Sequence, residues 1–328
     1  MSASKVLPYE DSASAREELI PFLTGAFPGG PDAARWRLRL AHWWDENPFC
    51  EPGSPRGWVL RHEGRLAGFL GLIPARYAAQ GAPVSALLGT SWYIVEGHRN
   101  AALPMAMQYQ RQAGAHLLVE TTPSPEVRAM LERAGWTGET RARRLLLPCG
   151  AVGSALVALR GKAWPSLQPG RRVVTDTAEV LAVARAWQRP DRLEKWVCPD
   201  SLRWYAASTM RRHLFAGVVD GAGCLSSFAW LTPHHSGQAR LAVLEGFTTE
   251  ADDTEWRALM GAVARGEAAW PGARAWALTW LAFDTDELAA GAPFLRAGWV
   301  DVCHYHKKPP AQAALPKHSV MAEGDFGL

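Results

Sequence analysis

The sequence predicts an α/β protein of the α+β kind, built from two tandem copies of one unit. At 328 residues the chain is longer than one ordinary domain, and its apolar share of 48% is typical of a globular protein. An order of two helices, a strand hairpin, a central strand, a helix and a later strand occurs twice. The tetrapeptide Arg-Ala-Gly-Trp at 133–136 returns at 296–299, at the same step of that order. A match that recurs with the element order indicates duplication, with a period of about 160 residues.

Two helices are predicted at the start of the first copy. Residues Glu10–Leu23 have helical spacing with an acidic first turn, and Gly and Pro breakers follow. Asp32 is a helix-capping residue, and the segment after it places Trp36 and Trp43 on one face. This second helix is expected to end before Pro48, because the residue before a proline disfavours helical backbone.

The strands of the first copy follow the helices. A two-residue turn, Glu63-Gly64, joins Gly57–His62 and Arg65–Pro74 into a hairpin. The β-like run Val84–Leu88 precedes the central strand Ser91–Val95, and an Arg-led loop and an amphipathic helix come after it. A strand, a helix with a proline in its first turn and a closing strand then complete the unit. These are His116–Thr121, Ser124–Arg133 and Thr140–Leu147.

The rest of the chain divides into a linker, a second copy and a tail. Residues 149–170 are rich in Gly, Ala and Pro and are expected to be a linker with one helical turn. Residues 171–308 repeat the order of residues 1–148, and each Arg-Ala-Gly-Trp is expected at a helix end before a strand. Residues 309–328 have no periodicity, which predicts a flexible tail.

Composition and charge argue against several classes of function. The net charge of +3 is small and no run of Lys or Arg appears, so a nucleic-acid partner is not expected. Five scattered cysteines and an amino-terminal stretch without an apolar signal segment predict a cytoplasmic protein without a metal cluster. No apolar run is long enough to span a bilayer, and the sixteen tryptophans are expected mainly to fill the core.

Several segments together resemble one known family. They are Trp-Asp-Glu-Asn-Pro at 44–48, the hairpin Glu63–Pro74, the central strand, the Arg-led loop and the helix that ends in Arg-Ala-Gly-Trp. In this order they are similar to the GNAT superfamily of N-acetyltransferases, in particular its tandem-domain bacterial members. The resemblance implies a mixed, mostly antiparallel sheet flanked by helices, which splays beside the central strand. The pantetheine arm of acetyl-CoA or another acyl-CoA would enter that gap and contact the backbone of Ile94 and Val95.

The resemblance also implies that the loop after the central strand wraps the pyrophosphate of the acyl-CoA. A helix start suits an anion because its first N–H groups are unpaired. The six loop positions are Arg99, Asn100, Ala101, Ala102, Leu103 and Pro104. Family members have Gly where Ala102 stands and a small residue with an N–H where Pro104 stands. The added Cβ and the missing donor predict a weakened anion site.

The usual catalytic pair of tandem relatives is replaced in this chain. The family's acidic residue on the central strand corresponds to Ser91, and its tyrosine acid on the second helix corresponds to Leu131. Glu120, at the end of the later strand, is expected to face the gap and is the candidate base; the alternative is a solvated or ion-paired Glu. Tyr93 is the candidate proton donor to the thiolate, and the alternative is a core aromatic. Because Tyr93 and Trp92 alternate along the strand, one of the two faces the gap.

The second copy is expected not to bind CoA. Glu245 matches the central-strand position, but the segment Gly246–Trp256 is acidic and lacks the loop Arg. His304 and His306 share one face of the last strand. Without a third ligand they are expected to be surface or interface residues and not a metal site.

Two classes of function remain open from the sequence. The first is an N-acyltransferase that moves an acyl group from a thioester to an amine of a small molecule or peptide, with an acyl-CoA, a carrier protein or an aminoacyl-tRNA as donor. The second is a catalytically degenerate protein that keeps the duplicated fold for binding or as a scaffold. In either case the expected state is a monomer with pseudo-dimeric domains or a homodimer.

Overall fold

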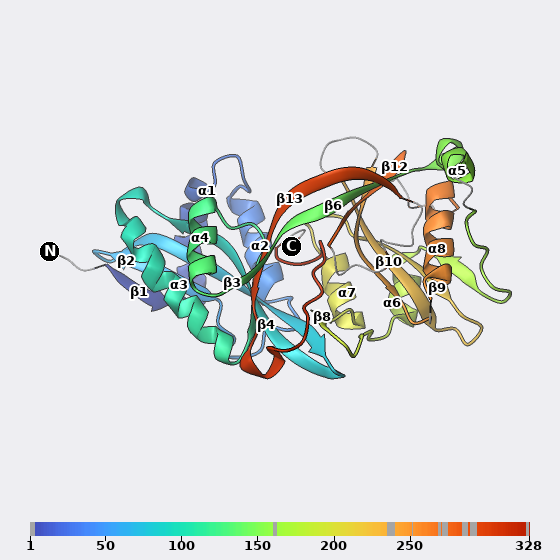
Figure 1. Cartoon of the computed structure of the whole chain (residues 1–328). Coiled ribbons are helices and arrows are strands. Elements are labelled where there is room, and N and C mark those ends of the chain that lie inside the picture. Colours follow the sequence, from blue (N-terminus) through green and yellow to red (C-terminus); the bar gives the residue numbers. More distant parts are fainter. Residues whose placement is uncertain are drawn as a thin grey trace.

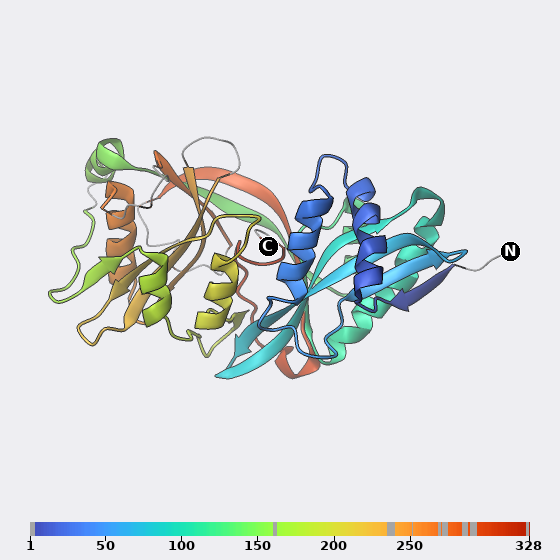
Figure 2. The same cartoon turned by 180° about the vertical axis from the view of Figure 1, so that it is seen from behind.

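The computed structural model of the chain is one large sheet with helices on both faces (Figures 1 and 2). It describes residues 4–159, 163–234, 240–250, 252–267, 270, 275–283, 288, 294–325 and 328. No helix in these ranges is long and apolar enough to cross a membrane.

The first half contains the predicted helix pair, hairpin and central strand. Its elements are β1 (Lys5–Pro8), α1 (Ala13–Ala26), α2 (Ala33–Trp44), β2 (Gly57–His62), β3 (Arg65–Ala79), β4 (Ala82–Ile94), the 3-10 helix η1 (Glu96–Ala101), α3 (Ala102–Arg111), the 3-10 helix η2 (Gln112–Gly114), β5 (Leu117–Glu120), α4 (Pro125–Arg133) and β6 (Thr137–Pro148). The side chains of Ser12, Asp32 and Ser124 each accept a hydrogen bond from the backbone N–H three residues later. These caps fix where α1, α2 and α4 begin.

The second half repeats this order after an additional helix. Its elements are α5 (Gly150–Leu159), β7 (Arg172–Val174), α6 (Thr177–Val183), β8 (Leu193–Lys195), α7 (Pro199–Ala206), β9 (Leu214–Val219), β10 (Leu225–Pro233), β11 (Arg240–Thr248), α8 (Thr254–Arg265), β12 (Ala277–Ala282), β13 (Leu295–Lys307) and the 3-10 helix η3 (Pro310–Gln312). Asp176 caps α6, and Gly266 ends α8 in the left-handed conformation that glycine adopts without strain.

The two halves exchange their last strands. The sheet has the order β1-β2-β3-β4-β5-β13-β6-β12-β11-β10-β9-β7, with β8 beside β3. β13 of the second half pairs with β5 of the first, while β6 of the first half pairs with β12 of the second. β6 and β13 also pair with each other, and Figure 1 shows them in green and red, side by side between the halves. Neither half therefore completes its part of the sheet alone.

The sheet is mixed and mostly antiparallel, as expected. β4 runs parallel to β5, and β11 runs parallel to β12 at the equivalent place in the second half. The other pairs between the named strands of the described ranges are antiparallel. The helices α1, α2, α6 and α7 cover one face, and α3, α4 and α8 cover the other (Figures 1 and 2).

Three segments before the tail differ from the sequence-based expectation. The runs Val84–Leu88 and Ser91–Val95 belong, up to Ile94, to one continuous strand, β4. The linker contains the ten-residue helix α5, where one turn was expected. The second Arg-Ala-Gly-Trp lies inside β13 and not at a helix end, with a register shift around Gly298, whose φ is 106°. The residues just before β13, at 289–293, lie outside the described ranges.

The sheet opens between β4 and β5. Their parallel pairing covers only Ala86–Leu88 and Leu117–Val119. The hydroxyl oxygen of Tyr109, on α3, lies 2.9 Å from the carbonyl oxygen of Leu87 and 3.0 Å from that of Val119. This hydroxyl group bridges the two strands close to the last paired residues, and beyond it the strands diverge.

Most tryptophans are buried core residues. Those below one-tenth exposure include Trp36, Trp43, Trp44, Trp58, Trp136, Trp187, Trp204, Trp230, Trp256, Trp270 and Trp280. Trp204 also joins the halves: its Nε1 donates to the backbone oxygen of His42 at 2.8 Å, which fastens α7 to α2. The tryptophan content thus serves mainly to fill an Ala-rich interior.

The carboxy-terminal segment is packed between the halves. Leu193 of β8 donates its backbone N–H to Pro316 and accepts from the N–H of His318, at 2.9 and 2.8 Å. The ammonium group of Lys317 donates to both carboxylate oxygens of Glu323, at 2.6 and 2.8 Å, and the two side chains are almost fully buried. This packing differs from the flexible tail that the missing periodicity predicted. Specific polar contacts hold the segment, and such contacts need no repeating pattern.

The buried ion pair of Lys317 and Glu323 should be essential for holding the carboxy-terminal segment in place. Burial by itself would raise the pKa of Glu323, but the Lys317 ammonium and His304 hold it well below its usual range. Lys317→Met leaves that carboxylate buried without its main partner. We expect the free energy of unfolding, measured by urea denaturation, to fall by about 3 kcal/mol or more.

Two matched variants control this prediction. The double variant Lys317→Met/Glu323→Leu should recover most of the loss, because an apolar pair can replace a buried ion pair at little net cost. Lys5→Met, at an exposed position, should change stability by less than about 0.5 kcal/mol. Equal small losses for Lys317→Met and Lys5→Met would contradict the assignment.

Candidate functional site

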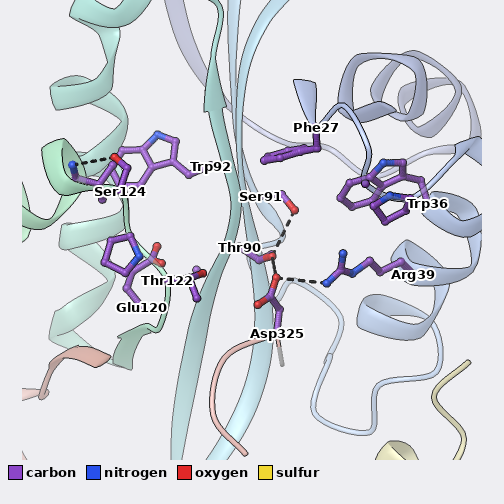
Figure 3. A pocket seen from close by; sticks show the side chains of 15 residues that line it. Phe27, Trp36, Arg39, Thr90, Ser91, Trp92, Glu120, Thr122, Ser124 and Asp325 are labelled. Carbon is purple, nitrogen blue, oxygen red and sulfur yellow. Dashed lines mark hydrogen bonds and ion pairs between the residues drawn. The ribbon is translucent and has the colours of Figure 1, made fainter. Parts of the chain in front are cut away.

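A cavity of about 330 Å³ lies where β4 and β5 diverge (Figure 3). Its walls come from the α1–α2 connection, α2, β4, the end of β5, the start of α4 and the carboxy-terminal segment. Polar side chains from segments that are distant in the sequence converge in it. A concave site of this kind is the default place to look for binding or catalysis.

The strand β4 carries a bulge at the cavity. Ser91 and Trp92 of β4 together oppose the single residue Leu70 of β3. Ser91 has a φ of 50°, in the left-handed region that is uncommon for a residue with a Cβ. Such bulges re-aim backbone groups and side chains, and they are frequent beside functional sites. Ser91 itself lines the cavity.

Glu120 ends β5, and its carboxyl group enters the cavity. The residue is 6% exposed, and its Oε1 has no hydrogen-bond partner among the described residues. Burial raises the pKa of Glu120 to about 8, with a further contribution from Asp325. The carboxyl group lies directly against Gly89 of β4, where any Cβ would overlap it. A buried carboxyl group with an open oxygen and a pKa near neutrality has the properties of a general base.

The carboxy-terminal segment brings a second carboxyl group into the cavity. The Oδ2 of Asp325 accepts a hydrogen bond from the hydroxyl of Thr90 at 2.8 Å and lies 3.5 Å from the guanidinium of Arg39 (Figure 3). Arg39 comes from α2, and its Nε donates to the backbone oxygen of Leu328 at 3.0 Å. Its guanidinium also lies over the ring of Trp36, 5.4 Å from the centroid. Arg39 thus positions both the aromatic wall and the tail.

Trp92 and Tyr93 lie on opposite faces of the sheet. Trp92 lines the cavity and packs on the core beneath α3 and α4 (Figure 3). The ring of Tyr93 packs against Phe22 and Phe27, at 5.9 Å from each, and does not line the cavity. Tyr93, the predicted proton donor, therefore occupies the place of a packed aromatic. Leu131, at the other position where relatives have an acid, is buried in the core.

The backbone of β4 past the bulge faces in two directions. The N–H of Val95 donates to the carbonyl of Ala67 on β3 at 2.9 Å. Alternate residues of an antiparallel strand direct their backbone groups to opposite sides. The N–H and C=O of Ile94 therefore face away from β3 and toward the gap. Of the two residues expected to contact a pantetheine arm, Ile94 presents its backbone there and Val95 keeps its N–H on β3.

The segment expected to wrap a pyrophosphate begins as a 3-10 helix. In η1 the N–H of His98 donates to Val95 at 2.9 Å, and the N–H of Ala102 donates to the carbonyl of Arg99. Because 3-10 bonds run three residues back along the chain, these N–H groups are already used. The segment therefore offers fewer open donors than a glycine-rich loop would.

The side chains of this segment point in different directions. Arg99 and Asn100 are exposed, Ala101 is buried in the core, and Ala102 is half-buried against it. Leu103 is 57% exposed on the outer surface of α3. Pro104 lies in the first turn of α3, where a proline does not interrupt a helix. Arg99 is thus the charged group of the segment that a ligand could reach.

The equivalent region of the second half is filled by aromatic side chains. Trp256, in the first turn of α8, lies against Gly246 of β11, and its Nε1 donates to the carbonyl of Phe228 at 3.2 Å. Its ring is 5.2 Å from that of Trp280. The neighbouring Glu255 is buried in an ion pair with Arg171. An acidic, aromatic-filled helix start is unfavourable for a pyrophosphate.

The two histidines of β13 lie at the contact with the carboxy-terminal segment. The Nδ1 of His304 is 3.4 Å from a carboxylate oxygen of Glu323. Burial, with a contribution from Lys317, lowers the pKa of His306 to about 3. Across the described ranges no group of three or more His, Cys, Asp or Glu side chains is placed to hold a metal ion.

Known proteins match this chain in structure and not in sequence. No family model matches the sequence, and neither does any curated protein. A probable N-acyltransferase from Enterococcus faecalis V583 superposes with a TM-score of 0.64 at 10% identity, over 93% of this chain and 72% of that one. A GCN5-related N-acetyltransferase from Kribbella flavida gives 0.60 at 13% identity, over 93% and 71%. A tandem GNAT protein from the clavulanic acid biosynthesis pathway gives 0.50 at 13%, over 94% and 99%. The chain has the tandem GNAT fold.

Two charged residues of this GNAT-fold cavity, Arg39 and Asp325, were not singled out from the sequence. Arg39 had a usable signal, because it stands between Trp36 and Trp43 on the aromatic face of a helix, where a charge needs a partner. Asp325 had none, because it belongs to a segment without periodicity. Its position follows from the buried anchor that Lys317 and Glu323 provide.

Glu120 should make the stability of this GNAT-fold chain depend on pH. Its pKa is about 8 in the folded chain and lower in the unfolded chain, where water surrounds the carboxyl group. Between these values the unfolded chain loses the proton and the folded chain keeps it, so the free energy of unfolding falls as pH rises. Above about pH 8 both forms are ionised and the decline ends. We expect Glu120→Gln to lack this decline and to melt at a higher temperature than wild type at pH 9.

The measurement is thermal melting of both proteins from pH 5 to pH 9. Glu126→Gln, which changes an exposed carboxylate at the start of α4, should keep the wild-type slope. Identical slopes for wild type and Glu120→Gln would show that Glu120 has an ordinary pKa.

Proposed function

We propose that this protein is an acyl-CoA-dependent N-acyltransferase whose acceptor is an amine of a small molecule or peptide. The observation that carries the proposal is Glu120. It is a buried carboxyl group at the point where the GNAT-fold sheet opens, and one of its oxygens has no hydrogen-bond partner in the part of the chain that the structure describes. Fold alone does not imply function, whereas this carboxyl group and its surroundings have the chemistry of a proton acceptor.

Glu120 would take up the proton that the acceptor must lose. An ammonium group beside Glu120 favours the ionised carboxylate, which then removes a proton and leaves a neutral amine. The amine nitrogen attacks the thioester carbonyl carbon and the new C–N bond forms. As the C–S bond breaks, the nitrogen releases a second proton and the thiolate takes up one, so that the products are an amide, a free thiol and protonated Glu120. The backbone at the bulge of Ser91 and Trp92 is the candidate donor to the oxyanion. Direct attack depends mainly on positioning, so the reaction does not need a tyrosine acid.

The donor would enter along Ile94, with Arg99 beside its phosphate groups. The 3-10 conformation and the missing N–H of Pro104 make this anion site weaker than a glycine-rich loop. A carrier-protein or aminoacyl-tRNA donor is the second candidate because it relies less on that loop. The remaining alternative is a binding or scaffold protein without catalysis. The exchanged strands are compatible with a monomer of two pseudo-symmetric halves, and a homodimer stays a prediction.

Acyl transfer should depend on Glu120. We expect Glu120→Gln to lower kcat by about 100-fold to 10,000-fold, the usual contribution of a general base. The measurement is thiol release from acetyl-CoA with a panel of amines. Gly89→Ala should cause a similar loss, because the added Cβ displaces the carboxyl group. Glu126→Gln is the control and should retain full activity. A Glu120→Gln variant with unchanged kcat would rule out the proposed base.

The donor site should depend on Arg99. We expect acetyl-CoA or a longer acyl-CoA to raise the melting temperature of the wild-type protein, and Arg99→Ala to reduce that shift, because a charge-assisted phosphate contact is lost. The matched control is Arg111→Ala, an exposed arginine in the last turn of α3, the helix that follows η1. If the acyl-CoA raises the melting temperature of Arg99→Ala as much as that of the wild type, the phosphate groups bind elsewhere. No shift with any CoA compound would favour the other donors or the scaffold alternative.

A further inference from the structure

A second cavity, of about 460 Å³, adjoins the first on the side of the second half. Thr122, Pro123 and Asp325 line both cavities. Asp325 thus lies at the boundary between the two cavities. A ligand group beside Asp325 in the first cavity would therefore lie next to the second cavity.

The walls of the second cavity are mainly apolar. They include Leu281 of β12, Val300 and Val302 of β13, and Met321 of the carboxy-terminal segment. All four side chains are half-buried, so each keeps a surface that can still be covered. Two further carboxylates border this cavity: Glu323, whose charge is balanced by Lys317, and Asp301, which is exposed. An apolar ligand part would therefore gain by displacing water here.

The charges at the boundary favour a cation. Two carboxyl groups, Glu120 and Asp325, meet one guanidinium group, Arg39. Figure 3 shows Asp325 between the other two, with Arg39 on the side away from Glu120. With both carboxyl groups ionised, the space between Glu120 and Asp325 carries a net negative charge. An ammonium group placed there would satisfy the Glu120 oxygen that has no partner among the described residues.

We propose that the acceptor is a primary amine carried by an apolar body. Its ammonium group lies between Glu120 and Asp325, and its apolar part lies in the second cavity against Leu281, Val302 and Met321. This inference rests on the proposed function and names the class of acceptor for the same site. It gives the second half a role in the reaction, because β12 and β13 supply the walls that select the acceptor.

Direct binding of simple amines tests the proposal without any acyl donor. The probes are n-hexylamine, which has both features, ethanolamine, which keeps only the ammonium group and a short polar body, and 1-hexanol, which keeps only the apolar chain. Isothermal titration calorimetry at pH 8 with the full chain should show n-hexylamine binding at least about tenfold more tightly than either of the others. Equal affinities for n-hexylamine and ethanolamine, or no binding of n-hexylamine, would overturn the proposal.

Substitutions in the second cavity locate the apolar part. Val302→Ser should weaken n-hexylamine about tenfold and leave ethanolamine unchanged. Leu281→Ser on the neighbouring strand provides a second variant, and circular dichroism verifies that each is folded. Val152→Ser, at an exposed position on α5, is the matched control and should not change either affinity. If neither cavity variant weakens n-hexylamine, the apolar part lies elsewhere and the proposal fails.

These binding results can be distinguished from the test of acyl transfer. Tight binding of n-hexylamine without acyl transfer would support this recognition site and reject the transferase. Transfer to ethanolamine and n-hexylamine with equal efficiency would support the transferase and overturn the assignment of acceptor class.

Discussion

The pairing of β6 with β13 is the contact on which the rest of the structure depends. β5 and β12 each have an edge that is not covered within their own half, and an unpaired strand edge is unfavourable in a soluble fold. The last strand of the opposite half covers it in both cases. Because β6 and β13 also pair with each other, the strands of the two copies form one continuous sheet. The helix α5 in the linker packs into the core of the second half through Val157.

The same exchange brings the carboxy-terminal segment to the first half. β13 ends beside the start of β5, where Lys307 pairs with Leu118, and the residues after it return toward the opening, where Asp325 lines the cavity with Glu120. The contacts of Pro316 and His318 with β8, and the buried pair of Lys317 and Glu323, then fix the path toward Asp325. The cavity is thus closed by α2, near one end of the chain, and by the tail at the other.

The duplicated halves have become chemically different at one equivalent position. The residue after the last parallel pair is Glu120 on β5 and Leu281 on β12. In the first half, Gly89 leaves room for the carboxyl group and the gap stays open. In the second half, Trp256 and Trp280 fill the corresponding interior, and Leu281 faces the second cavity. The two halves therefore supply a polar cavity at this position in one case and an apolar wall in the other.

The sequence by itself determined the helices, the hairpin, the repeat and the place of Glu120 in the gap. Helix caps such as Asp32, the Glu63-Gly64 turn and helical spacing act within a few residues, so they can be recognised from the local sequence. Only the tertiary structure decided that Trp92 and not Tyr93 lines the cavity, through the bulge at Ser91. It also decided the strand exchange and the contact of Thr90 with Asp325, 235 positions apart. Contacts between such distant residues depend on the whole packed sheet and leave no local pattern.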